Sequence, residues 1–87
     1  MKWLVAFDIS DDKIRRKISA LLLKYGCRIQ YSIFEIEIPF KKVNDLYWDC
    51  SQLLNKGDRL LFIPQTDNDC KGRIYLGNRK FFRWMIV

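Results

Sequence analysis

Two stretches of the chain repeat apolar residues at the spacing of an amphipathic helix, and strand-like apolar runs lie before, between and after them. Residues 11–25 form the first stretch, and the second follows Pro39 and ends at Gly57. Gly26 stands where a left-handed cap would close the first helix. One face of each stretch carries its large apolar residues, as in a helix packed on a core. These residues are Ile14, Ile18, Leu21, Leu22 and Tyr25 in the first stretch, and Val43, Leu46, Tyr47, Cys50, Leu53 and Leu54 in the second.

The segments around these helices have the composition of β-strands. Residues 2–7 are dense in large apolar residues without alternation, which predicts a central strand covered on both faces. In residues 28–38 the parity of the apolar residues changes near Ile33, so this segment forms either two short strands or one strand with a bulge. Residues 59–63 predict another apolar strand.

A polar loop over residues 66–72 and a short strand over residues 73–76 are expected after these elements. The resulting order, β-α-β-β-α-β, predicts an α+β, ferredoxin-like fold in which both helices cover one face of an antiparallel sheet. We expect residues 1–77 to form this domain and residues 78–87 to be a C-terminal strand or tail that docks on its own sheet or a partner's. The uncovered sheet face and the apolar tail together predict a homodimer.

The amino-acid composition excludes several kinds of site. The 87 residues include no histidine, so neither a Ser-His or Cys-His nucleophile nor a histidine-based zinc site can form. The cysteines, at positions 27, 50 and 70, are too far apart in sequence for a C-x-x-C pair and predict free thiols in a reducing cytoplasm. No apolar run approaches the length of a membrane span, and the first residues do not resemble a signal peptide.

Positive charge is concentrated in two blocks of the chain, whose formal net charge is +6. Residues 13–28 and residues 71–83 contain several lysines and arginines and no acid. Within the first block, the basic residues fall on the side of the expected helix opposite its apolar face; they are Lys13, Arg16, Lys17 and Lys24. Such a stripe suits a phosphate backbone, and the alternative is an ordinary solvated helix face.

Asp8 follows the first strand directly, where a sheet would hold its carboxylate rigidly. A residue at this position is more often a cap or turn residue, and capping explains Ser10 and the two aspartates after it better than chemistry does. One carboxylate cannot enclose a Ca²⁺ ion, but two from a symmetric dimer could hold Mg²⁺, which keeps several of its waters. Residues 67–69 contain two more aspartates, which we interpret as a turn.

Two motifs in combination resemble the CRISPR-associated Cas-two family. Residues 3–13 read WLVAFDISDDK and residues 28–35 read RIQYSIFE. The resemblance covers nearly the whole chain, because further segments also fit. These are Arg15, Arg16 and Lys17, the pair Tyr25-Gly26, the later DRLLFIP of residues 58–64 and the Leu76-Gly77 ending.

This resemblance implies a homodimeric protein of CRISPR adaptation that binds nucleic acid and bridges copies of the Cas-one integrase during spacer acquisition. It also implies a metal-dependent endonuclease acting on RNA or DNA, with Asp8 as catalytic residue and Mg²⁺ ligand. Arg15, Arg16, Lys17 and Arg28 are then the nucleic-acid-binding residues, with Phe34 and Ser10 in support. One position departs from the pattern, because many members place tyrosine before the aspartate and this chain has Phe7.

Two alternatives share the expected architecture. One is a toxin-like ribonuclease of the virulence-associated protein D type, which a neighbouring antitoxin gene would indicate. The other is a non-catalytic RNA-binding module, which reads RNA by aromatic residues on an open sheet face and predicts a monomer.

Overall fold

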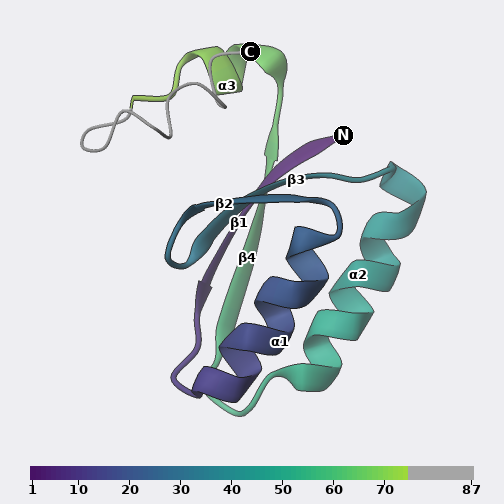
Figure 1. The fold of residues 1–87 in the computed structure, drawn as a ribbon. Helices are drawn as coiled ribbons and strands as arrows, with labels where there is room; N and C mark the ends of the chain where they lie inside the picture. The colour runs from purple at the N-terminus through teal and green to yellow at the C-terminus, as the bar shows by residue number, and fades with distance from the viewer. Residues whose placement is uncertain (75–87) are drawn as a thin grey trace.

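The computed structural model describes residues 1–74 of the chain, and Figure 1 shows their arrangement. The elements of this part are β1 (Lys2–Asp8), α1 (Asp12–Leu23), β2 (Gly26–Gln30), β3 (Ile33–Glu37), α2 (Phe40–Leu53), β4 (Arg59–Gln65) and α3 (Asp67–Lys71). The four strands form one sheet in the order β2-β3-β1-β4, in which every neighbouring pair is antiparallel. Helices α1 and α2 lie side by side on one face of this sheet (Figure 1). The predicted α+β, ferredoxin-like fold is confirmed.

The core lies between this sheet face and the two helices. Along β1, Trp3, Val5 and Phe7 point into it and are buried, whereas Leu4 and Ala6 point to the other face and are only partly buried. We expected β1 to be covered on both faces. Within a single chain, the helices cover one face of the strand and the other face stays uncovered. The helices contribute their apolar stripes to the same core, mainly Ile18, Leu22, Val43, Leu46 and Cys50.

The segment in which the parity of the apolar residues changes, residues 28–38, contributes to two strands, β2 and β3. The second of them pairs with β1. The chain reverses at Tyr31 and Ser32, where the amide of Phe7 donates a hydrogen bond of 3.0 Å to the carbonyl of Ser32. The ladder between β2 and β3 also shifts register between Arg28 and Gln30. The hairpin and the bulge are thus both present, although the sequence alone favoured neither.

Helix α1 ends earlier than expected, and Gly26 does not cap it. The helix is closed by Lys24 in a right-handed helical conformation, and its amino end is capped by the Asp11 carboxylate, which accepts hydrogen bonds from two amides of the first turn. Gly26 instead begins β2 because its backbone runs directly against that of Glu35 and Ile36. Within residues 1–74, the one glycine with positive φ is Gly57, in the turn after α2.

The polar segment after β4 forms a short helix, so the predicted loop over residues 66–72 was wrong. Thr66 and Asp69 form a reciprocal capping box at the start of α3, and hydrogen bonds to Thr66 lower the pKa of the Asp69 carboxyl. Arg73 and Ile74 are not in a strand, and the remainder of the strand expected over residues 73–76 lies outside the described residues, as does the tail over residues 78–87. Within residues 1–74, no helix is long and apolar enough to cross a membrane.

Candidate functional site

Asp8 is the last residue of β1, and its side chain is exposed. Alternation along the strand places it in the same row as Leu4 and Ala6, on the sheet face that the helices leave uncovered. Its register partner across the ladder is Arg59, at the first position of β4. Among the described residues no hydrogen bond or ion pair engages the Asp8 carboxylate, which leaves its oxygens available to a ligand.

The loop between β1 and α1 is held together by Arg15. Its Nη1 atom donates hydrogen bonds to the carbonyls of Ile9 at 2.7 Å and Ser10 at 3.0 Å, and its guanidinium forms an ion pair with Asp12. Much of the hydrogen-bonding capacity of Arg15, a predicted nucleic-acid-binding residue, is therefore already used within the chain. Ser10 enters these contacts through its backbone carbonyl, and its side chain is exposed.

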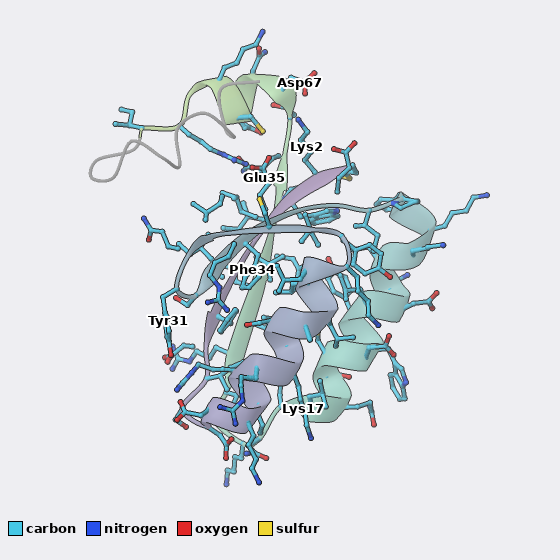
Figure 2. All side chains as sticks on the ribbon, viewed as in Figure 1. Lys2, Lys17, Tyr31, Phe34, Glu35 and Asp67 are labelled. Carbon is cyan, nitrogen blue, oxygen red and sulfur yellow. The ribbon has the colours of Figure 1, made fainter. Side chains whose placement is uncertain are left out.

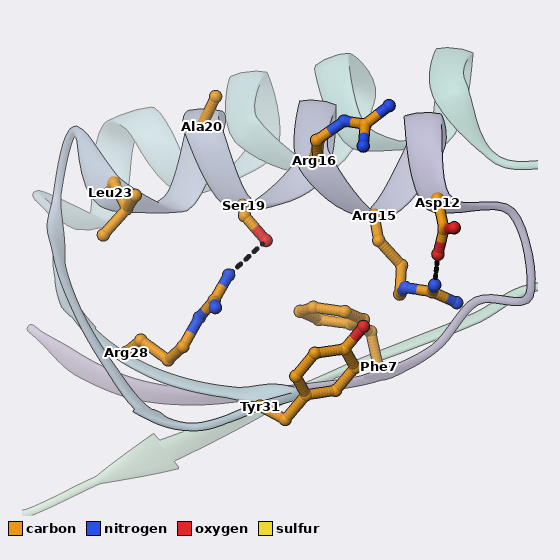
Figure 3. Close-up of a pocket in the computed structure, with 9 residues that line it drawn as sticks. All are labelled: Phe7, Asp12, Arg15, Arg16, Ser19, Ala20, Leu23, Arg28 and Tyr31. Atoms are coloured by element: carbon orange, nitrogen blue, oxygen red, sulfur yellow. Dashed lines mark hydrogen bonds and ion pairs between the residues drawn. The ribbon is translucent and has the colours of Figure 1, made fainter.

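A cleft of about 440 Å³ opens between α1 and the turn that joins β2 to β3 (Figure 3). Three of the predicted nucleic-acid-binding residues line it, Arg15 and Arg16 from α1 and Arg28 from β2, and the ring of Tyr31 stands near its mouth. The full lining is Phe7, Asp12, Arg15, Arg16, Ser19, Ala20, Leu23, Arg28 and Tyr31. Three arginines against one aspartate make the cleft cationic.

Arg28 crosses this cleft toward α1. Its Nη2 atom donates a 3.1 Å hydrogen bond to the hydroxyl of the buried residue Ser19, and its guanidinium lies 5.2 Å from the ring centroid of Phe34. Phe34 itself is fully buried and stacks on Phe7 with a centroid distance of 5.9 Å. The predicted supporting residue Phe34 thus lies in the core, and its ring packs beneath the guanidinium of Arg28. Because Phe34 is buried, a ligand cannot touch most of that ring.

The cationic stripe predicted on the first helix is exposed as expected. Arg16 lines the cleft, whereas Lys17 lies outside it and points away from the sheet (Figure 2). All four members are exposed; they are Lys13, Arg16, Lys17 and Lys24. Within residues 1–74 none of them forms an ion pair, so the positive charge of this face is not neutralised by the chain itself.

The structure separates the predicted site residues into two groups on opposite faces of β1. The cleft with Arg16 and Arg28 lies beside Phe7, on the helix side, whereas Asp8 belongs to the uncovered face. Sequence reasoning did not identify Tyr31 or Ser19 as parts of the cleft. A large aromatic residue beside the parity change, within the motif RIQYSIFE, was the one available signal for Tyr31.

The uncovered face carries apolar side chains from β4 as well as β1. Leu61 is 58% exposed and Ile63 is 37% exposed. At the other end of this face, Arg73 donates a 3.0 Å hydrogen bond to Glu35 and two more to the side-chain oxygen of Gln65 (Figure 2 labels Glu35). This arrangement fastens the segment after α3 to β3 and β4. Burial, together with the nearby Glu35 carboxylate, raises the pKa of the Cys27 thiol in the same region.

Comparisons with known proteins bear on both groups of residues. The family model of CRISPR associated protein Cas2 matches residues 1–73, which include the whole of β1, the cleft and β4. A curated relative named CRISPR-associated endoribonuclease Cas2 2, from Methanospirillum hungatei, is 37% identical over 75 residues that cover 85% of this chain and 82% of that protein.

Two solved structures have the same fold. The crystal structure of Streptococcus pyogenes Cas2 superposes with a TM-score of 0.82 and 26% identity over 88% of this chain and 100% of that one. A chain of a structure titled "Partial Cas6-RT-Cas1--Cas2 complex" superposes with a TM-score of 0.75 and 28% identity, covering 86% of this chain and 83% of that one. Because the family model spans nearly all the described residues and the fold agrees, the chain belongs to the CRISPR associated protein Cas2 family.

Proposed function

We propose that this protein is a homodimeric, nucleic-acid-binding subunit of CRISPR adaptation that assembles with a Cas1 integrase and hydrolyses phosphodiester bonds in the presence of Mg²⁺. The observation that carries the catalytic part is the position of Asp8, exposed and unengaged at the end of β1 and in one row with Leu4 and Ala6. The assembly with Cas1 is supported by the likeness to a chain in a complex whose title names both proteins.

The uncovered sheet face supports the dimer. Leu61, Ile63, Leu4 and Ala6 form an apolar surface that water would otherwise contact. In a two-fold pair that stacks these faces, equivalent rows of the two sheets meet. Where the two-fold axis passes close to the end of β1, Asp8 from one protomer would face the partner's Asp8, and the pair would bring together two carboxylates that one chain cannot supply.

The chemistry of Asp8 fits a divalent cation. Mg²⁺ takes oxygen ligands and usually combines one or two carboxylates with waters and substrate phosphates. Within residues 1–74 no group of three acidic, cysteine or histidine side chains is placed to hold a metal ion. When bound, such an ion activates water and neutralises charge on phosphate oxygens. Asp8 would hold such an ion through its carboxylate oxygens.

The basic residues have a separate part in the proposal. The reaction adds water to phosphorus and breaks one P–O bond of the nucleic-acid backbone, and the exposed stripe on α1 attracts that backbone. Arg16 and Lys17 would neutralise phosphates by charge alone and carry no base specificity. Arg15 acts as a positioning residue, because its bonds to Ile9 and Ser10 fix the loop that directly follows Asp8.

The test compares wild-type protein with Asp8→Asn in nuclease assays on single-stranded RNA and duplex DNA, with Mg²⁺ and with EDTA. We expect cleavage to require both Asp8 and the metal, while salt-sensitive DNA binding persists in the variant because it depends on the basic residues. Asp45→Asn is a matched control, since Asp45 is also exposed but lies on α2. Cleavage that survives either Asp8→Asn or EDTA would contradict the metal mechanism.

A further inference from the structure

The cleft between α1 and the turn after β2 contains an exposed aromatic ring flanked by two cations. Tyr31 is 69% exposed, and the guanidinium carbons of Arg15 and Arg28 lie 5.8 and 5.9 Å from its ring centroid. Figure 3 shows the ring between these two arginines at the open side of the cleft. Hydrophobic burial does not explain this position, because most of the ring surface is in water.

The arginines around the ring differ in what they can still bind. Arg15 is occupied by two backbone carbonyls and by Asp12. Arg28 uses one N–H for Ser19 and keeps other donors of its guanidinium for a ligand. Arg16 is exposed at the α1 rim of the cleft, and its side chain points away from Arg28 (Figure 3). An anion entering the cleft would therefore meet Arg28 beside an aromatic face, with Arg16 at the rim.

We propose that this cleft binds one nucleotide of a single-stranded nucleic acid, with the base stacked on Tyr31 and its phosphate bound by Arg28. The proposal rests on nucleic-acid binding by this protein and goes beyond it by assigning one unpaired base to the ring of Tyr31. Aromatic rings beside cationic grooves bind single strands in this way because every base has a π-face. Bases inside a duplex are stacked on one another and cannot reach the ring, whereas the α1 stripe can contact the backbone of either form.

The size and composition of the cleft agree with this ligand. Its volume of about 440 Å³ is in the range of small-molecule sites. Its lining includes an excess of two positive charges, from three arginines and one aspartate, which suits a phosphodiester. The buried hydroxyl of Ser19 and the floor provided by Phe34 hold Arg28 in place, so the cation on this wall is oriented before a ligand arrives.

The experiment measures the affinity of the full-length protein for three probes: an oligothymidylate of five nucleotides, an abasic phosphodiester of equal length, and a short DNA duplex. We expect Tyr31→Ala to weaken oligothymidylate binding by about 5- to 150-fold, the range for loss of one base–aromatic stack. Affinity for the abasic strand and the duplex should stay within about twofold, since neither offers an unpaired base. Tyr31→Phe keeps the ring and should bind all three probes like the wild type.

Two further variants isolate the parts of the cleft. Trp48→Ala removes an aromatic ring of similar exposure, 66%, from α2, which takes part in no cation–π contact among residues 1–74, and should change nothing. Arg28→Gln should weaken binding of the oligothymidylate and the abasic strand alike, because it removes a phosphate contact. In NMR spectra, the Tyr31 ring protons should shift with oligothymidylate and not with the abasic strand.

The results separate this proposal from the proposed function. If Tyr31→Ala leaves oligothymidylate affinity unchanged, or lowers the affinity for all three probes equally, stacking on Tyr31 is excluded. If the wild type binds the duplex but not oligothymidylate, the cleft proposal fails while duplex binding by the α1 stripe stands. Failure to bind any of the probes would overturn both.

Discussion

Asp8 and Arg59 are register partners at the end of the β1–β4 ladder, yet no ion pair joins their side chains in the described part of the chain. Replacing Asp8 by asparagine therefore removes no partnered charge and opens no cavity. We expect the free energy of unfolding of Asp8→Asn to lie within about 0.5 kcal/mol of the wild-type value. Urea denaturation followed by circular dichroism measures it. A large loss of stability would show that the carboxylate is structural and would contradict its assignment as a free metal ligand.

The uncovered sheet face can be tested through Leu61. Light scattering of the wild type at micromolar concentration should give about twice the 10.5 kDa chain mass. Leu61→Asp adds a charge to the centre of the apolar surface and should shift the protein toward the monomer, because an unpaired charge is costly to bury. Trp48→Asp, on the exposed side of α2, is the matched control and should remain dimeric. A monomeric wild type would refute the two-carboxylate site as well.

The contribution of the cationic stripe on α1 to DNA binding can be tested by charge reversal, with two lysines on α2 as a control of equal charge. Arg16→Glu with Lys17→Glu should weaken duplex DNA binding of all sequences alike and reduce the salt dependence by about 0.9 in log-log slope for each phosphate that the variant no longer neutralises. Lys41→Glu with Lys42→Glu changes the net charge by the same amount at other exposed positions. Equal effects of the two pairs would indicate a general effect of net charge, with no specific contact at α1. Titration at several salt concentrations distinguishes these results.

Gly26 is required by close contact between two backbones. A Cβ at this position would overlap the carbonyl oxygen of Glu35 and stand 2.7 Å from the Cα of Ile36, so β2 would have to move away from β3. We expect Gly26→Ala to lower the free energy of unfolding by about 2 kcal/mol or more. Gly72→Ala is the control, because its nearest neighbours are at 3.5 Å or beyond and its φ of −81° suits any residue. Thermal melting of the two variants should separate clearly.

Ionisation of the buried Cys50 thiol should lower the free energy of unfolding at high pH. Burial raises the pKa of its thiol from the ordinary 9.0 to about 11, and the Asp49 carboxylate adds to the effect. The folded state holds the proton more tightly than the unfolded state, so the contribution is complete below pH 9 and is lost as pH rises toward 11. The stability advantage of the wild type over Cys50→Ala should shrink over this window by on the order of 2 kcal/mol. Parallel urea titrations at about pH 8 and about pH 11 measure it, and a constant difference would contradict the prediction.

Much of the fold could be predicted because its signals are local. The amphipathic period identified both long helices, and the parity change near Ile33 marked an irregularity there without deciding between a hairpin and a bulge. The turn at Tyr31 and Ser32 contains neither glycine nor proline, and it is held from outside by the amide of Phe7, which no local pattern reveals. Helix α3 is only one turn long, and its capping pair of Thr66 and Asp69 was the single available sign.

The site was harder to predict than the fold. Arg15 and Arg28 have the same charge and were both predicted to bind nucleic acid, yet one is held by its own loop and the other reaches across to Ser19. Which donors remain free depends on tertiary contacts, and so does the gathering of Tyr31 with two arginines. The separation of Asp8 from the cleft follows from strand parity and could have been derived from the burial of Phe7.

The alternation along β1 also limits how the length of this chain can vary. The strand is hydrogen-bonded on both sides, and its odd-numbered residues from Trp3 to Phe7 belong to the core while Asp8 belongs to the other face. Inserting or deleting a single residue between Trp3 and Asp8 would exchange the two faces from that point on, turning the aspartate toward the core and Phe7 toward water. Related chains should therefore tolerate length changes in the turn around Gly57, while the spacing from Trp3 to Asp8 stays constant.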